Sequence, residues 1–142
     1  MHDDVLLNKT ATIERCVARA REEYQFDPAG FARNYTRQDA AILNVQRACE
    51  AALDMGQHLL RRECLGVPQS ARDVFALLAR GGWLDEDLAR ALQRMVGFRN
   101  IAVHDYQAMQ LPIVVKVITG HLDEFLRYSE CLLKKDAENQ SY

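Results

Sequence analysis

Residues with reactive side chains gather in one stretch of the chain, residues 97–106. Arg99, Asn100, His104 and Tyr106 lie there within about two helical turns, with apolar residues between them. A histidine titrates near neutrality and can take or give a proton. A guanidinium binds phosphate oxygens in a bidentate manner and can stabilise the negative charge that develops during phosphoryl transfer. This combination suits metal-free RNA cleavage, in which a ribose hydroxyl attacks the neighbouring phosphate.

Each polar residue of this stretch has a candidate role, and a structural interpretation remains open beside it. His104 would be the general base or acid, and Arg99 would bind the phosphate. Asn100 could orient His104 or cap a chain end. Tyr106 could stack on a base, bond to a phosphate, or act as a hydroxyl nucleophile toward a modifying group. Alternatively, an arginine or histidine near a helix end can cap carbonyls or pair with a carboxylate such as Asp105.

Helical geometry limits how these side chains can meet. Each residue advances about 100° around a straight helix, so Arg99 and Tyr106 would share a face, while His104 would lie roughly 140° from Arg99. Two solutions remain open. The helix can end near Val103, which would swing His104 back, or a second copy of the chain can complete the site. The second solution predicts a symmetric dimer with an active site at its interface.

Helices are the elements that must position this stretch, because no segment alternates between polar and apolar residues for long enough to be a strand. Thr36 and Asp39 resemble an N-terminal capping pair, Gly66 is a candidate left-handed cap, and Ser70 and Asp85 are candidate N-caps. We expect one domain, residues 1–142, folded as an all-α antiparallel bundle of four long helices plus one short helix. The expected helices are Val5 to Gln25, Thr36 to about Cys64, a short one from Ser70 to Gly81, one from Asp85 through the motif, and a last one from Leu111 to about Lys135.

Composition excludes several classes of protein. A formal net charge of −2 over 142 residues gives no strong global field, so RNA binding requires a local basic lining. The four cysteines are scattered singly, which disfavours a zinc site and a disulfide framework, and we expect neither a metal nor a cofactor. The start of the chain lacks the pattern of a signal peptide, and no apolar run reaches membrane-spanning length. We therefore expect a reduced, cytoplasmic protein that does not enter a membrane.

The stretch resembles the HEPN superfamily, and most closely the HepT toxins. The HEPN signature is an arginine, four to six residues, and then a histidine; here Arg99 and His104 have four residues between them. Asn100 occupies the polar position often found after the arginine, and Tyr106 matches the tyrosine that HepT toxins carry two residues after the histidine. The resemblance extends to residues 38–51, 66–68 and 75–78.

This resemblance implies a specific activity and a specific regulation. HepT toxins are helical homodimers and metal-independent endoribonucleases, whose paired motifs line a cleft between the subunits. Arg99 and His104 match the catalytic pair, with Asn100 in support. The toxin is encoded with a minimal nucleotidyltransferase antitoxin, MntA, which transfers AMP from ATP onto the tyrosine that matches Tyr106. The added phosphates would bring negative charge beside Arg99 and compete with RNA. The resemblance thus implies a type VII-like HepT/MntA toxin–antitoxin system with RNA as the substrate.

Two other hypotheses remain open at this point. The chain can be a non-catalytic helical module that binds a nucleotide or a partner and works with a nucleotidyltransferase. It can also be a structural dimer, in which case Arg99 and His104 would be buried and saturated by carboxylates.

Overall fold

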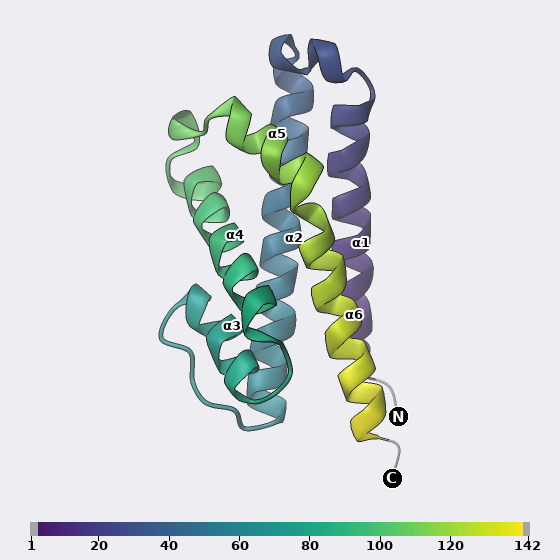
Figure 1. The fold of residues 1–142 in the computed structure, drawn as a ribbon, viewed down its shortest axis with the longest axis vertical. Coiled ribbons are helices and arrows are strands. Elements are labelled where there is room, and N and C mark those ends of the chain that lie inside the picture. The colour runs from purple at the N-terminus through teal and green to yellow at the C-terminus, as the bar shows by residue number, and fades with distance from the viewer. Residues whose placement is uncertain (1–2, 141–142) are drawn as a thin grey trace.

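The computed structural model describes residues 3–140, and its regular elements over that range are all helical, as the sequence predicts (Figure 1). Met1, His2, Ser141 and Tyr142, which belong to the expected domain 1–142, lie outside the described residues. Two short 3₁₀ helices, η1 and η2, accompany six α-helices. In chain order the elements are α1 (Asp4–Gln25), η1 (Pro28–Arg33), α2 (Tyr35–Arg62), α3 (Ala71–Arg80), α4 (Glu86–His104), η2 (Tyr106–Ala108), α5 (Leu111–Gly120) and α6 (Leu122–Asn139).

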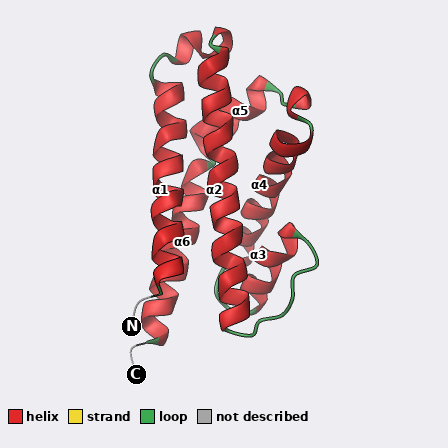
Figure 2. Cartoon of the chain, turned by 180° about the vertical axis from the view of Figure 1, so that it is seen from behind, coloured by secondary structure: helices red, strands yellow, loops and turns green. Residues whose placement is uncertain are grey.

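The long helices form an antiparallel bundle around α2. In Figure 1, α1 and α4 run upward while α2 and α6 run downward. Figure 2 shows α2 between α1 and α4, with α6 behind α1 and α2. Because α2 contacts α1, α3, α4 and α6, it is the element on which the other helices are seated. No helix among residues 3–140 combines the length and the apolarity needed to span a bilayer.

Side-chain caps fix where most of the helices begin. The Asp3 carboxylate accepts hydrogen bonds from the backbone N–H groups of Val5 and Leu6 at the start of α1. Ser70 and Asp85 cap α3 and α4, which confirms both predictions.

The predicted cap of α2 is wrong. The capping residue is Asn34, two residues before Thr36. Its side-chain oxygen accepts a hydrogen bond from the backbone N–H of Arg37 at 3.1 Å. Thr36 lies inside the first turn of α2. Asp39 is consequently free for a contact with another element.

The structure has one more helix boundary than the sequence predicts. The predicted last helix is divided at Gly120 and His121 into α5 and α6. Glycine weakens a helix, and the Leu122 and Phe125 side chains are buried in the core once the chain has turned. The bundle therefore has four long helices and two short ones. After α2, Gly66 has a φ of 117°, as expected for a left-handed position, and Cys64 precedes it at a φ of 55°.

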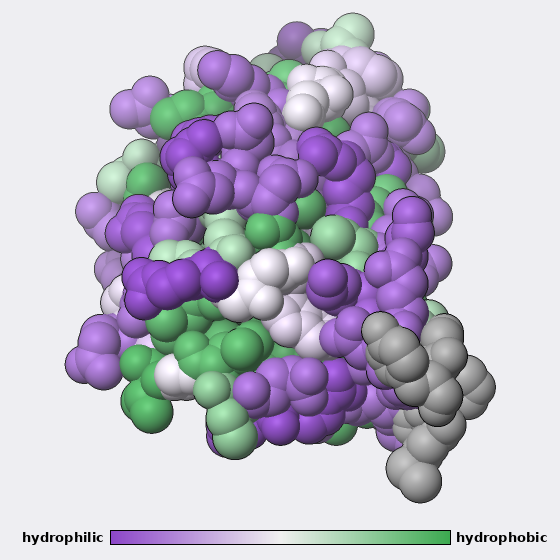
Figure 3. Space-filling model, turned by 60° about the horizontal axis from the view of Figure 1, so that its bottom comes forward, coloured by the Kyte–Doolittle hydropathy of each residue, from purple (hydrophilic) through white to green (hydrophobic). Residues whose placement is uncertain are grey.

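All six α-helices contribute side chains to the core, and one of its closest contacts lies where α2, α3 and α6 meet. Tyr128 of α6 is fully buried, and its hydroxyl donates to the Ala52 carbonyl of α2 at 2.7 Å. Gly56 lies beside this contact. A Cβ there would be 2.6 Å from Val74 Cγ1 and 2.8 Å from Tyr128 Oη, so only glycine allows this close approach. Outside the core, the end of the bundle seen in Figure 3 is covered mainly by hydrophilic residues, with a smaller apolar area between them. Packing in the core holds α2 in place, and α2 in turn contacts α4, which carries Arg99 and His104.

Candidate active site

Arg99 lies on the side of α4 that faces α2. Its guanidinium is close enough to Cys49 of α2 to act on that thiol: burial raises the pKa of Cys49 to about 12, and the Arg99 charge opposes this rise. The Nε atom of Arg99 is buried and has no hydrogen-bond partner within residues 3–140. No carboxylate of the described chain forms an ion pair with Arg99. Its charge is therefore available to an anionic ligand.

His104 is the last residue of α4, and its side chain is exposed. Within the described residues it has neither a hydrogen bond nor an ion pair, so both ring nitrogens are open to a ligand. Because α4 stays helical through His104, the ring lies roughly 140° around the axis from Arg99. The helix ends only after His104, so its end does not swing this residue back toward Arg99. Asn100, one turn before His104, is half-buried on the same side of α4.

The same observations bear on the structural interpretation of the motif. If Arg99 and His104 served only to hold the fold, they would be buried and paired with carboxylates. Within residues 3–140, Arg99 has no carboxylate partner, and His104 is exposed. One copy of the chain does not use either side chain to stabilise its fold through an ion pair.

Tyr106 does not share a face of α4 with Arg99, contrary to the prediction for a straight helix. The backbone leaves the helical conformation at Asp105, with φ −151° and ψ 55°, and Tyr106 begins η2. Its hydroxyl donates a hydrogen bond to the Asp39 carboxylate of α2. Tyr106 is thus held against α2 and remains partly exposed, at 43 %.

The contact with Asp39 changes the acidity of the Tyr106 hydroxyl. Burial, the hydrogen bond to Asp39 and the negative charge of Asp39 raise the pKa of Tyr106 from 10.0 to about 12. The phenol therefore keeps its proton at neutral pH, and a carboxylate that can accept this proton lies beside it. Sequence reasoning missed Asp39, because its contact crosses 67 positions of the chain and no local pattern indicates it.

Other histidines and cysteines of the chain have structural surroundings. The His58 ring is 2.6 Å from an Asp3 carboxylate oxygen, and the His121 ring is 2.8 Å from Glu124. Each ring is thus paired with a carboxylate of the chain. The four cysteines are free thiols. Over residues 3–140, no three side chains of the metal-ligating types come together.

Apolar side chains remain exposed close to the motif. Ile101 and Val103 of α4 are 37 % and 43 % exposed, and Ile113 of α5 is 44 % exposed. Ile101 and Ile113 line a groove of about 270 Å³ between α4 and α5, together with Phe98. This apolar surface flanks the end of α4 that carries Arg99 and His104.

Comparison with known proteins places this geometry in a family context. Residues 13–132 match the family model described as Ribonuclease HepT-like. The chain is 45 % identical over 130 residues to the mRNA nuclease HepT of Shewanella oneidensis. The alignment covers 92 % of this chain and 97 % of that protein.

Solved structures are similar over nearly the whole chain. One is a toxin–antitoxin complex with AMP-PNP, and another is the tri-AMPylated HEPN toxin of Shewanella oneidensis in complex with its MNT antitoxin. Each has a TM-score of 0.88 and 45 % identity, and covers 92 % of this chain and 98 % of its own. The cytosolic protein YutE of Bacillus subtilis, at 14 % identity and a TM-score of 0.73, shares the fold, with 93 % of each chain covered. These findings confirm the resemblance that the motif indicated.

Proposed function

The chain belongs to the HepT-like ribonuclease family and is an endoribonuclease of that family, and we propose that its active site is a cleft shared by two copies of the chain. It is the toxin of a toxin–antitoxin system with a nucleotidyltransferase antitoxin, as its relatives are. The observation that supports a shared cleft is that Arg99 and His104 point in different directions from α4. Arg99 and His104 have no ion-pair partners in the described chain, yet they lie on different sides of α4. A two-fold axis beside α4 would bring Arg99 of one copy toward His104 of the other.

In this cleft the chain's own groups are sufficient for the chemistry. His104 takes the proton from a ribose hydroxyl, whose oxygen attacks the adjacent phosphorus. The bond from phosphorus to the oxygen of the next ribose breaks, leaving a cyclic phosphate. That leaving oxygen then receives the proton that the same His104 ring has taken up. Arg99 binds the phosphate and stabilises the added negative charge of the transition state, and Asn100 orients His104.

The exposed apolar surface supports the placement of the second copy. Ile101 and Val103 flank the motif on α4, and apolar surface of this kind is typically covered by a partner. Covering it would exclude water from the cleft and strengthen the interaction of Arg99 with phosphate.

Tyr106 is the acceptor of the silencing modification in this proposal. Its hydroxyl is partly exposed, close in sequence to His104, and positioned by Asp39. Transfer of AMP to this oxygen by the antitoxin places a phosphate beside the cleft, where it competes with RNA for Arg99. The tri-AMPylated state of the Shewanella toxin supports this regulation.

RNA cleavage by purified, unmodified protein in the presence of a chelator tests the catalytic assignment. We expect Arg99→Ala and His104→Ala each to lower the rate at least a hundredfold, because a positioned acid–base group contributes roughly 10²–10⁴. Arg127→Ala on α6 is the matched control and should cut at the wild-type rate, because this arginine is exposed and has no ion pair within residues 3–140. Folding of every variant is checked by circular dichroism.

Two results would contradict the assignment. Cleavage that persists in a well-folded His104→Ala variant would favour the non-catalytic module, with the observed cutting due to another protein. Cleavage that stops when the chelator is added would show that a metal is required.

A further inference from the structure

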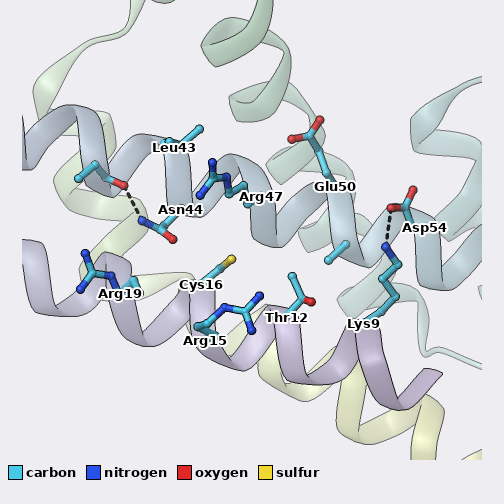
Figure 4. A pocket seen from close by; sticks show the side chains of 12 residues that line it. Lys9, Thr12, Arg15, Cys16, Arg19, Leu43, Asn44, Arg47, Glu50 and Asp54 are labelled. Carbon is cyan, nitrogen blue, oxygen red and sulfur yellow. Dashed lines mark hydrogen bonds and ion pairs between the residues drawn. The ribbon is translucent and has the colours of Figure 1, made fainter. Parts of the chain in front are cut away.

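A groove of about 630 Å³ runs between α1 and α2 (Figure 4). Arg15 and Arg19 line it from α1, and Arg47 lines it from α2. In Figure 4, Arg15 and Arg47 lie on the two sides of the groove, with Cys16 between the helices. Both guanidinium charges reach Cys16: burial raises the pKa of that thiol, and Arg15 and Arg47 oppose the rise.

Arg15 and Arg47 are uncommitted in the described chain. Both side chains are exposed, and neither forms a hydrogen bond or an ion pair with a carboxylate of residues 3–140. Arg19, in contrast, is paired with Glu22 and Glu23. Two free guanidinium groups facing one groove repel each other, and an anion between them would relieve this repulsion.

The acidic residues of the groove are partnered within the chain. Asp54 forms an ion pair with Lys9 at 3.1 Å, and Glu50 accepts a hydrogen bond from the Gln46 side-chain amide at 3.2 Å. Four basic and two acidic residues line the groove, which gives its lining a formal charge of +2, whereas the whole chain carries −2. The groove is therefore a local basic surface on an acidic protein.

The groove and the motif lie on neighbouring helices, because α2 forms one wall of the groove and contacts α4. Figure 2 shows α2 between α1, which forms one wall of the groove, and α4, which carries the motif. Asp39 and Arg47 both lie on the exposed side of α2, eight residues apart, which corresponds to about 12 Å along the helix. Asp39 contacts Tyr106, so a few nucleotides of single-stranded RNA would cover the distance from the modification site to Arg47.

We propose that the groove between α1 and α2 binds the phosphates of single-stranded RNA outside the cleft, with Arg15 and Arg47 as the phosphate-binding residues. The planar fork of arginine matches phosphate oxygens, and Leu43 on the rim, 40 % exposed, offers an apolar surface to a base. This assignment rests on the ribonuclease function proposed above. It accounts for how a chain with net negative charge holds a polyanionic substrate.

The test measures RNA binding separately from RNA cleavage. The probe is a fluorescent single-stranded RNA whose ribose hydroxyls are methylated, so that it binds without being cut. Its dissociation constant is measured by anisotropy over a range of salt concentrations. The test variant is Arg15→Gln/Arg47→Gln in the full, unmodified protein. Arg80→Gln/Arg127→Gln removes the same charge from α3 and α6 and is the matched control.

Loss of two phosphate contacts should reduce the slope of log affinity against log salt by about 1.4, since each contact to a single strand contributes about 0.7. We expect the affinity of the test variant to fall roughly tenfold at low salt, with a smaller fall for the control. Arg15→Lys/Arg47→Lys keeps both charges and should keep the slope. Cleavage of a long RNA should show a raised KM, while cleavage of a dinucleotide, which is too short to reach the groove, stays unchanged.

Three results would overturn the groove assignment. A wild-type salt slope in the folded Gln variant shows that RNA does not contact these arginines. An unchanged slope with a weakened antitoxin complex shows that the groove binds protein. A Gln variant that is monomeric where the wild type is dimeric shows that the groove is an interface between copies. A wild type that binds the probe but cuts no RNA contradicts the ribonuclease function and leaves the binding result for the groove standing.

Discussion

At the scale of single residues, the candidate catalytic groups Arg99 and His104 have no carboxylate partner within residues 3–140. Arg99 carries a buried Nε donor with no partner in the described chain, and His104 is exposed at the end of α4. A buried donor without a hydrogen bond costs free energy, and the phosphate that we propose as the ligand of Arg99 would reduce this cost. The Tyr106 hydroxyl, in contrast, is held by Asp39.

The contact between Tyr106 and Asp39 predicts a role for Asp39 in the modification. In the modification proposed above, the Tyr106 oxygen would attack the α-phosphorus of ATP, the bond to pyrophosphate would break, and the phenol proton would have to leave. Asp39 is the carboxylate in place to accept it. We expect Asp39→Asn to slow AMP transfer by the antitoxin roughly 10²–10⁴-fold, and Asp105→Asn, a neighbouring exposed carboxylate, to leave the rate unchanged.

The pH dependence separates proton acceptance from simple positioning. The pKa of Tyr106 is raised to about 12 partly by Asp39, so it should move back toward 10.0 in the Asp39→Asn variant. The rate of AMP transfer to the Asp39→Asn variant should then rise with pH, as the Tyr106 hydroxyl loses its proton to the solvent. Mass spectrometry of the Tyr106 peptide measures the transfer. Wild-type rates of AMP addition in Asp39→Asn would show that Asp39 only packs against Tyr106.

Sequence reasoning identified Arg99, His104 and Tyr106 as candidates because their types and spacing are local features. It did not identify Asp39, Arg15 or Arg47. Asp39 reaches Tyr106, and Arg15 and Arg47 line one groove, only because helices that are distant in the sequence pack together. Their spacing along the chain does not indicate these contacts.

At the scale of elements, the Asp3 carboxylate connects the N-terminal end of α1 to α2, and through Arg62 to α6. Asp3 caps α1 and also binds the His58 ring and Arg62 of α2, at 2.6 and 2.7 Å. Arg62 in turn pairs with Asp136 of α6 at 2.7 Å. Burial alone would raise the pKa of Asp3, but hydrogen bonds from His58, the Leu6 backbone and Arg62 outweigh burial and hold the pKa below its ordinary value of 3.8.

This network predicts an acid-sensitive contribution to stability. Because the pKa of Asp3 is lower in the folded state, its contribution is present above pH 3.8 and is lost as the pH falls through the folded value. Asp3→Asn keeps a good N-cap but loses the charge, so we expect a free energy of unfolding lower by about 1–3 kcal/mol at neutral pH. The loss should shrink in acid.

Urea unfolding at a series of pH values measures this effect. Asp4→Asn, an exposed acidic residue in the first turn of the same helix, is the control and should change the stability by less than about 0.5 kcal/mol. A constant difference between Asp3→Asn and the wild type at every pH would show that the charge of Asp3 does not contribute.

Helix positions were largely predictable, because apolar periodicity and capping residues act over a few positions. Ser70 and Asp85 cap the helices that they were expected to cap. The division at Gly120 was missed, since the apolar pattern continues across it and only packing against the core requires the turn. The Thr36 cap was wrong because Asn34, an equally good capping residue, precedes it.

At the scale of the whole molecule, α2 lies between the two surfaces to which we assign functions. One is the motif at the end of α4, and the other is the basic groove along α1. The overall charge of −2 conceals this distribution, because a sum over the sequence says nothing about where charges gather. The sequence did predict that one copy of the motif is not a complete site, and the helical geometry of α4 through His104 supports that prediction.

Mixing two inactive variants tests the shared cleft most directly. Arg99→Ala and His104→Ala proteins are co-unfolded and refolded together, so that mixed dimers form, and RNA cleavage is measured. If Arg99 of one copy works with His104 of the other, each mixed dimer regains one intact site, and cleavage should recover to roughly a quarter of the wild-type rate for random pairing. If mixed dimers form and cleavage does not recover, both groups must come from the same chain, and the shared cleft is wrong.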